Sequence, residues 1–294
     1  MDNRKKILFI INPISGTGKK KVVEKLLDKL LDPAAINHEI KYTERSGHAV
    51  EIAKNVVENN THQVVVAVGG DGSVNEVSRG LIGSDVELGI IPAGSGNGFA
   101  RHLRIPLKFD EAIKTILKGK SIRVDTGLVG NENFFGIAGV GFDAYISKKF
   151  DEANTRGFWT YFKLTLSEYL KYKERDYTIK FDDKGEDKVF KSLILCFCNS
   201  SQWGNDAFIS PNSNIQDGFL RIVIIGKIPL ISVPYFAFRL FKKSVHKSKY
   251  YQEIKMKSCS VVQNDKIIHL DGEPLEYGNE FTIRVLPKSL TVIA

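Results

Sequence analysis

The chain has 294 residues, of which 43% are hydrophobic and 26% are charged, and this balance is typical of a globular protein with an ample core. The formal charge of +8 at pH 7 indicates an anionic partner, such as a nucleotide, a nucleic acid or an acidic membrane face. The three cysteines, Cys196, Cys198 and Cys259, argue against a disulfide framework and for a reducing compartment.

Residues 1–125 alternate between strand-like and helix-like patterns. Apolar runs predict strands at 6–11, 38–43, 63–68, 86–91 and 122–125. The segments between them predict helices at 19–31, 47–59, 73–81, 97–103 and 109–118. Such alternation indicates a parallel sheet with helices on both faces, and ligands of such sheets bind at the carboxyl ends of the strands.

The rest of the chain is dominated by strand-like patterns. They occur at 176–200, 219–226, 250–270 and 280–293, with helical patterns at 157–173 and 230–241. We therefore predict an α/β domain over residues 1–125, to which residues 287–294 are a candidate to return. Residues 126–286 are predicted to form a second, β-rich domain.

Glycine-rich segments follow three of the predicted strands. They are Asn12-Pro13-Ile14-Ser15-Gly16, Gly69-Gly70-Asp71-Gly72-Ser73 and Pro92-Ala93-Gly94-Ser95-Gly96-Asn97. Glycines let a backbone approach a ligand closely, and free N–H groups at a strand-to-helix turn bind phosphate. Asp71 adds a carboxylate that suits Mg²⁺ or a lysine. The segments match neither the Walker A spacing nor the three spaced glycines of dinucleotide-binding folds, which argues against P-loop NTPases and ordinary dehydrogenases.

Each of these features also has a plain structural interpretation. Taken alone, the segment after residue 91 is a helix-capping turn, Asp217-Gly218 is a turn before a strand, and Asp271-Gly272-Glu273-Pro274 is a hairpin turn. Cys196 and Cys198 alternate along a strand and are interpreted as buried apolar residues. The six histidines lack metal-ligand spacing, and we interpret them, His269 included, as surface or cap residues.

Taken together and in order, the glycine segments resemble the diacylglycerol kinase catalytic domain. The resemblance is strongest to the bacterial soluble lipid kinases of a superfamily that also includes sphingosine and ceramide kinases, and it covers the whole chain. Further matches are Thr43, Gly47-His48-Ala49, Asp125 with Gly127, Asp217-Gly218-Phe219-Leu220 and Asp271-Gly272-Glu273. One position departs from many bacterial members, because Gly98 stands where they carry an acid.

The resemblance implies a Rossmann-like nucleotide domain, as in phosphofructokinases and NAD kinases, followed by a β-sandwich domain that binds the lipid. It implies that ATP is bound by Asn12, Ser15, Gly16, Thr43, Gly69, Gly70, Asp71, Gly72, Ser73, Asn75, Gly94, Ser95, Gly96 and Asn97. Glu273 would accept the proton of the lipid hydroxyl, with Asp71 and Asp271 as further catalytic residues. Asp217 and the backbone oxygens of Asn214 and Phe219 would bind a structural Mg²⁺, and Asp71 and Asp125 would lie near the catalytic Mg²⁺.

The predicted function is therefore that of an ATP- and Mg²⁺-dependent kinase that phosphorylates a lipid hydroxyl, such as that of diacylglycerol. A sphingoid base or another lipid alcohol, an NAD kinase-like reaction and a non-catalytic nucleotide or lipid sensor remain alternatives. No pattern for nucleic-acid binding is present, and a homodimer is compatible with the sequence.

The expected location is the cytoplasm, with transient contact at the inner membrane face. The N-terminal apolar run is too short for a signal peptide. Residues 228–249 are apolar and aromatic and then basic, which suits either an anionic membrane surface or a helix of the second domain's core.

Overall fold

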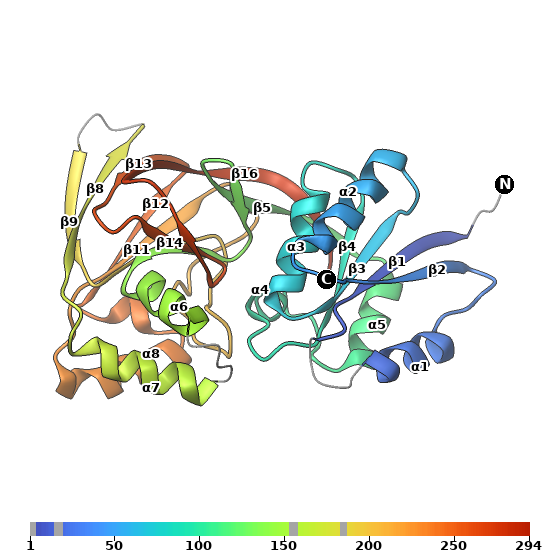
Figure 1. Cartoon of the computed structure of the whole chain (residues 1–294), viewed down its shortest axis with the longest axis horizontal. Coiled ribbons are helices and arrows are strands. Elements are labelled where there is room, and N and C mark those ends of the chain that lie inside the picture. Colours follow the sequence, from blue (N-terminus) through green and yellow to red (C-terminus); the bar gives the residue numbers. More distant parts are fainter. Residues whose placement is uncertain (1–3, 15–19, 153–157, 183–186) are drawn as a thin grey trace. The chain divides into compact units, whose positions relative to one another are not determined.

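The computed structural model describes residues 4–14, 20–152, 158–182 and 187–294. The chain divides into two compact units (Figure 1). Unit 1 consists of Met1–Val124 together with Lys288–Ala294, and unit 2 consists of Asp125–Pro287. The last strand therefore belongs to both units, because it runs from Glu280 to Ile293.

Unit 1 alternates strands and helices as the apolar runs predict. Its elements are β1 (Lys5–Ile11), α1 (Lys20–Leu30), β2 (Ile36–Tyr42), α2 (His48–Asn59), β3 (Val64–Gly69), α3 (Asp71–Leu81), β4 (Glu87–Pro92), α4 (Gly98–His102), α5 (Phe109–Lys118) and the start of β5 (Ser121–Val129).

The strands of unit 1 form a parallel sheet in the order β2-β1-β3-β4. The end of β16 (Glu280–Ile293) adds to β4 in the same direction, with Val292 opposite Leu88. Helices α2 and α3 cover one face of this sheet, and α1 and α5 cover the other (Figure 1). Every residue of β3 is buried, which explains why this strand reads as an uninterrupted apolar run rather than an alternating one.

Unit 2 is built mainly from antiparallel strands. Its elements are the rest of β5, then β6 (Glu132–Phe134), β7 (Ile137–Gly141), α6 (Phe142–Glu152), α7 (Phe158–Tyr169), β8 (Arg175–Phe181), β9 (Asp187–Ser192), β10 (Ile194–Cys198), β11 (Leu220–Ile225), η1 (Leu230–Ser232), α8 (Val233–Phe241), η2 (Val245–Lys247), β12 (Tyr251–Met256), β13 (Ser258–Val262), β14 (Ile267–Leu270), β15 (Glu273–Glu276) and the start of β16.

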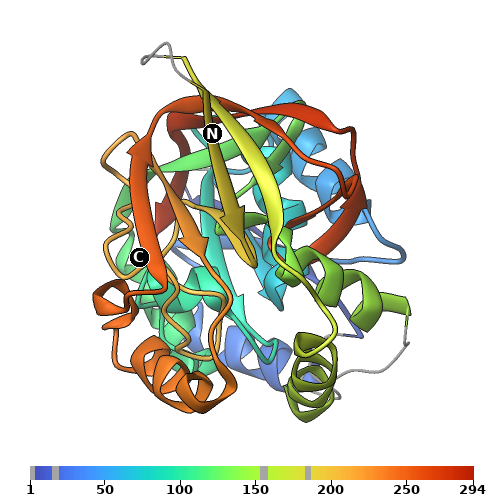
Figure 2. The ribbon, with the colours of Figure 1, turned by 90° about the vertical axis from the view of Figure 1, so that its left-hand side faces the viewer.

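Two sheets pack face to face in unit 2 (Figure 2). One contains β16, β13, β8 and β9, and the other has the order β12-β11-β10-β7-β14-β15. Strand β10 is buried on both faces: Leu195 and Phe197 enter the core between the sheets, whereas Cys196 and Cys198 face a second apolar cluster that includes Phe236 of α8. The predicted burial of the two cysteines is confirmed.

The predicted fold class, a parallel α/β domain followed by a β-sandwich, is confirmed, and the errors are local. No element was predicted between residues 131 and 156, where the structure has β6, β7 and α6. The stretch 250–270 is three strands, and 230–241 is a 3-10 turn followed by the helix α8.

Candidate functional site

The glycine segments of unit 1 lie at the carboxyl edge of its parallel sheet. Backbone hydrogen bonds continue the strand pairing past the strand ends: the Thr43 N–H donates to the Ile11 carbonyl at 3.0 Å, and the Asn12 N–H donates to the Val68 carbonyl at 3.2 Å. The Ala93 N–H donates to the Gly69 carbonyl at 2.7 Å. The sheet therefore brings residues from four separate strands to one edge, as parallel topology requires.

The second and third glycine segments touch each other. A Cβ atom on Gly94 would lie 2.5 Å from the Cα of Gly70, and a Cβ on Gly96 would lie 2.8 Å from Oδ2 of Asp71. Gly94 thus requires glycine for space rather than for an unusual backbone angle, whereas a side chain at position 96 would displace the Asp71 carboxylate. The result is a stretch of bare backbone beside the Asp71 carboxylate.

Helix α3 begins at this bare backbone. Gly70 is its N-cap and supplies no side-chain hydrogen bond to the helix. The N–H groups of a helix's first turn lack partners within the helix and carry partial positive charge. Asn12 comes from the first segment and donates through Nδ2 to the Ser73 hydroxyl at 3.3 Å, so the first and second segments also meet. This arrangement suits an anion with several oxygens.

Asn97 shapes the third segment through its own side chain. It has a left-handed φ of 50°, and its amide bonds to Gly94 twice: Oδ1 accepts the Gly94 N–H at 3.1 Å and Nδ2 donates to the Gly94 carbonyl at 2.8 Å. The predicted role of Asn97 as a phosphate donor would have to compete with these bonds. Ser95, by contrast, is exposed.

Two polar residues that the sequence analysis left without a role support these segments. Glu76 accepts hydrogen bonds from the N–H groups of Gly47 at 2.9 Å and Ala49 at 3.2 Å, and so caps the start of α2. Arg101 donates through Nε to the Gly96 carbonyl at 3.1 Å and brings a cation to the glycine turn. Both are polar residues within a few positions of a glycine segment, which is the signal that could have found them.

The remaining residues that the sequence predicts to bind the nucleotide stay predictions. Asn75 is buried in the first turns of α3, and Gly72 lies between Asp71 and Ser73 on the same turn. Ser15 and Gly16 lie outside the described residues.

In unit 2, the Asp-Gly-Glu segment forms a two-residue hairpin turn. Leu270 pairs with Glu273, and the turn residues Asp271 and Gly272 have φ angles of 51° and 91°. Positive angles at both positions are what a type I′ turn requires, and Asp-Gly is a favoured sequence for it. Glu273 begins β15 and is exposed. The structural interpretation of this segment as a hairpin is therefore correct, and it leaves the carboxylate of Glu273 at the surface of unit 2.

Asp271 fastens this turn to the rest of unit 2. Its Oδ1 accepts the N–H groups of Gly136 at 2.7 Å and Ile137 at 2.9 Å, and its Oδ2 accepts that of Phe135 at 2.9 Å. Three hydrogen bonds to one carboxylate are strong and directional. These contacts give Asp271 a positioning role, and its predicted catalytic role stays a prediction.

The interpretation of His269 as a surface or cap residue is wrong. The side chain is buried, and its Nε2 lies 2.8 Å from Oδ2 of Asp143. Its other ring nitrogen, Nδ1, accepts the N–H of Gly272 at 3.3 Å. Sequence patterns could not reveal this burial, because the partner Asp143 is distant in sequence. His269 thus links a buried carboxylate to the turn that precedes Glu273.

Cys196 completes this buried cluster. Its Sγ donates to Oδ2 of Asp143 at 3.0 Å, and ligand atoms of Asp143, Cys196 and His269 lie within 4.8 Å of one another. Such a set could in principle hold a metal ion. However, burial, and after it the Asp143 carboxylate, raises the pKa of the Cys196 thiol, so the thiol stays protonated. The cluster is therefore satisfied as a set of hydrogen bonds.

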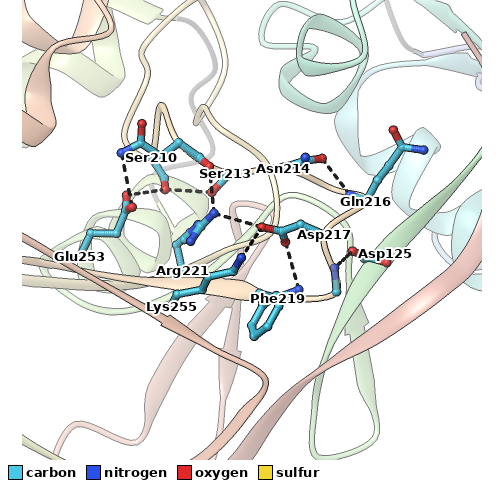
Figure 3. A network of polar contacts seen from close by, with 12 residues as sticks. Asp125, Ser210, Ser213, Asn214, Gln216, Asp217, Phe219, Arg221, Glu253 and Lys255 are labelled. Carbon is cyan, nitrogen blue, oxygen red and sulfur yellow. Dashed lines mark hydrogen bonds and ion pairs between the residues drawn. The ribbon is translucent and has the colours of Figure 1, made fainter.

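Asp217, the predicted ligand of a structural Mg²⁺, lies in a network of polar contacts (Figure 3). Its Oδ1 accepts the Phe219 N–H at 3.1 Å, and its Oδ2 contacts Arg221 at 3.1 Å and Lys255 at 3.0 Å. The oxygen donors are of the type that Mg²⁺ prefers. Two side-chain cations nevertheless already neutralise this carboxylate, so the arrangement fits Mg²⁺ poorly unless they move.

Asp125 supports the same loop. It is completely buried, and its Oδ2 accepts the Gly218 N–H at 2.7 Å, as Figure 3 shows. Its N–H donates to the Ile215 carbonyl at 2.6 Å. The structure thus joins Asp125 to the Asp217 segment within unit 2, while Asp71 belongs to unit 1.

Comparisons with known proteins agree with this organisation. Residues 6–129 match the family described as diacylglycerol kinase catalytic domain, and residues 136–294 match the one described as YegS C-terminal NAD kinase beta sandwich-like domain. The chain belongs to the bacterial diacylglycerol kinase-like lipid kinase family.

Members of this lipid kinase family resemble the chain over most of its length. The diacylglycerol kinase of Staphylococcus saprophyticus is 29% identical over 279 residues, which cover 92% of this chain and 89% of that one. That of Staphylococcus aureus strain RF122 is 28% identical over 294 residues, covering 96% and 90%. A crystal structure of a diacylglycerol kinase from Bacillus anthracis shares the fold, with a TM-score of 0.73, 22% identity and coverage of 99% and 96%.

Among the described residues, no helix combines the length and hydrophobicity that crossing a bilayer requires.

Proposed function

We propose that this lipid kinase transfers the γ-phosphoryl group of ATP to the hydroxyl group of diacylglycerol. The observation that carries the proposal is the contact between Gly70 and Gly94, which leaves bare backbone at the edge of the parallel sheet. Phosphoryl transfer depends mostly on positioning and charge neutralisation, and backbone N–H groups at a helix start supply both without moving.

In the proposed mechanism, unit 1 binds the triphosphate. The N–H groups of the first turn of α3 bind phosphate oxygens, and Asn12 and Ser73 border them. Asp71 lies beside Gly96 at the same place, where a carboxylate would hold a bound Mg²⁺ that neutralises charge on the phosphates. Arg101 orders the third segment through the Gly96 carbonyl.

Glu273 acts as the proton acceptor. The lipid hydroxyl oxygen forms a bond to the γ-phosphorus while the bond from that phosphorus to the bridging β–γ oxygen breaks, and ADP leaves. The hydroxyl proton passes to the Glu273 carboxylate and then to solvent, because an alcohol is a weak nucleophile until a base takes its proton. Glu273 lies at the surface of unit 2, on the hairpin that the hydrogen bonds of Asp271 hold in place, and this position supports its role as proton acceptor.

A lipid panel with radiolabelled ATP tests the proposal. Diacylglycerol, ceramide and sphingosine are offered separately in mixed micelles with Mg²⁺, and NAD is offered in solution. Labelled phosphatidic acid from diacylglycerol is the expected product. Product from a sphingoid base alone would identify the sphingoid base as the acceptor, and product from NAD alone would indicate an NAD kinase-like enzyme.

A binding measurement separates these outcomes from a non-catalytic sensor. Calorimetry with a non-hydrolysable ATP analogue reports nucleotide affinity without turnover. Binding of the analogue without labelled product from any acceptor would overturn the kinase proposal and support a sensor.

A further inference from the structure

Helix α8 is apolar on two opposite sides. On its inner side, Phe236 is buried, and Val233 and Leu240 pack against the same apolar cluster of unit 2. On its outer side and in the preceding turn η1, four large apolar side chains are mostly exposed: Ile231 at 92%, Tyr235 at 60%, Phe238 at 54% and Phe241 at 51%. A surface helix is normally polar on its outer side, so the apolar outer side of α8 suits contact with a second apolar environment.

The outer side chains form one surface. Tyr235 and Phe238 are three residues apart on α8, a spacing that places side chains on one face of a helix, and Ile231 lies in the turn η1 just before it. The rings of Tyr235 and Phe238 are stacked with centroids 6.5 Å apart. Single exposed apolar residues are common on proteins, whereas a contiguous exposed group marks an interaction site. We call Ile231, Tyr235, Phe238 and Phe241 the α8 face.

The α8 face is bordered by positive charge. Residues 227–252 contain Lys227, Arg239, Lys242, Lys243, Lys247 and Lys249 and no Asp or Glu. Lys242 lies 5.9 Å from the centre of the Phe238 ring, and Arg239 lies 4.7 Å from that of Tyr235. Within the part of the chain that the structure describes, no carboxylate forms an ion pair with Lys242 or Lys243. These cations are therefore available to an anionic partner.

Helix α7 and the residue that follows it carry two further exposed leucines. Leu166 and Leu170 are separated by four residues and are 50% and 65% exposed. In both ribbon views, α7 and α8 lie along the same end of unit 2 (Figures 1 and 2).

We propose that the α8 face docks unit 2 on an anionic phospholipid bilayer. Ile231, Tyr235, Phe238 and Phe241 enter the boundary between headgroups and acyl chains, and Lys242 and Lys243 contact lipid phosphates. An apolar face combined with adjacent lysines supplies the two signals that stable interfacial binding requires. The inference deepens the proposed function, since it gives the enzyme access to a lipid acceptor, but docking itself needs no turnover.

Charge argues against a second copy of the chain as the occupant. A symmetric pair would place the same surface of each copy against the other. The acid-free segment 227–252 would then face itself, and like charges would repel. A bilayer containing phosphatidylglycerol carries the complementary charge instead.

The test is cosedimentation of the full chain with vesicles, without nucleotide. Vesicles are made of phosphatidylcholine alone or of phosphatidylcholine mixed with phosphatidylglycerol. We expect binding to the anionic vesicles that weakens as salt is added. The double variant Ile231→Ser/Phe238→Ser should bind at least about tenfold more weakly, and Lys242→Gln/Lys243→Gln about tenfold or more. Because these side chains are exposed, both variants should keep the wild-type melting temperature.

Matched controls come from strand β9 of the same unit. Val189 is 65% exposed, and Lys188 and Lys191 flank it. Val189→Ser and Lys188→Gln/Lys191→Gln should bind vesicles like the wild type. Undiminished binding by the Ile231→Ser/Phe238→Ser variant would overturn the proposal. A wild-type dimer that this variant converts to a monomer, with vesicle binding unchanged, would instead assign the face to self-association.

Failure of docking and failure of the kinase reaction give different results. Glu273→Gln should bind vesicles like the wild type, because Glu273 does not belong to the α8 face. If the wild type binds vesicles but phosphorylates no lipid, docking stands and the proposed reaction fails. If the wild type phosphorylates diacylglycerol in micelles yet does not bind anionic vesicles, the reaction stands and docking fails.

Discussion

The imidazole Nε2 of His269 lies 2.8 Å from Oδ2 of Asp143, and both side chains are buried. Since Nδ1 of the same ring accepts the Gly272 N–H, that nitrogen carries no proton and Nε2 donates to the carboxylate. The pair thereby fixes the tautomer of His269 and the position of the turn before Glu273. A buried network of this kind is stabilising only while every member has its partner.

The first prediction concerns this pair. Replacing His269 by Ala leaves the buried Asp143 carboxylate with one partner fewer, so the free energy of unfolding should fall by roughly 1–3 kcal/mol. Because the turn before Glu273 loses its support, kcat should fall on the order of 10-fold to 100-fold while the ATP affinity stays near wild type. Thermal denaturation and steady-state kinetics measure the two effects. His62→Ala, which removes a histidine that contacts Glu39 in unit 1, is the control.

One result would show that His269 contributes to folding stability and not to catalysis. If His269→Ala lowers the melting temperature but leaves kcat unchanged, the Asp143–His269 pair does not position Glu273. Cys196→Ser keeps a hydrogen-bond donor on Asp143 and should retain kcat near the wild-type value.

The second prediction concerns the proposed base. Glu273→Gln keeps the size of the side chain and removes its ability to accept a proton, so kcat should fall by at least about 100-fold. ATP affinity should not change, because the segments proposed to bind phosphate belong to unit 1. Glu276 lies on the same strand and forms an exposed ion pair with Lys148 at 2.9 Å. Glu276→Gln is therefore the matched control, and equal kcat values for the two variants would rule out Glu273 as the base.

The third prediction concerns the contact between glycine segments. In Gly94→Ala the new Cβ would lie 2.5 Å from the Cα of Gly70, so the two segments must separate. We expect kcat/KM for ATP to fall on the order of 10-fold to 100-fold, since small displacements of positioning groups are costly. Gly278→Ala is the control, because its Cβ would meet nothing closer than 3.5 Å. Wild-type ATP kinetics in Gly94→Ala would show that the contact is dispensable.

The sequence predicts the parts of the fold that local pattern encodes. Strand β3 of unit 1 is buried on both faces, so the apolar run at residues 64–68 identifies it directly. The glycine segments are equally legible in the sequence, and the structure explains one of their glycines directly, because a Cβ on Gly94 would meet the Cα of Gly70.

What the sequence could not predict depends on contacts between distant residues. Strand β7 contains Gly139 and Gly141 and shows no alternation, since a Cβ on Gly139 would lie 2.4 Å from both Asp143 and His269. The contact of His269 with Asp143 and the ion pair of Asp217 with Lys255 likewise join residues far apart in the chain. Periodicity carries no information on such pairs.

The fourth prediction concerns Asp217 and divalent ions. Since Arg221 and Lys255 already neutralise its carboxylate, EDTA should leave the melting temperature of the nucleotide-free protein unchanged. Asp217→Asn should lower the free energy of unfolding by roughly 1–3 kcal/mol, because it leaves the largely buried Arg221 without its charged partner. The control is Asp110→Asn, which removes an exposed pair with Lys114 and should have little effect. A marked fall in melting temperature with EDTA would indicate that a metal ion displaces the two cations.

The fifth prediction concerns pH and His102, at the end of α4. Burial, and after it the Arg104 charge, lowers the pKa of His102 from 6.5 to about 4. Between those values the unfolded chain binds a proton that the folded chain does not, so the stability present above pH 6.5 should be lost as the pH falls toward 4. The contribution is on the order of 1–3 kcal/mol. Chemical denaturation at several pH values should show a flatter profile for His102→Gln than for the wild type. His246→Gln, which alters an exposed histidine, should keep the wild-type profile, and an unaltered slope in His102→Gln would contradict the assignment.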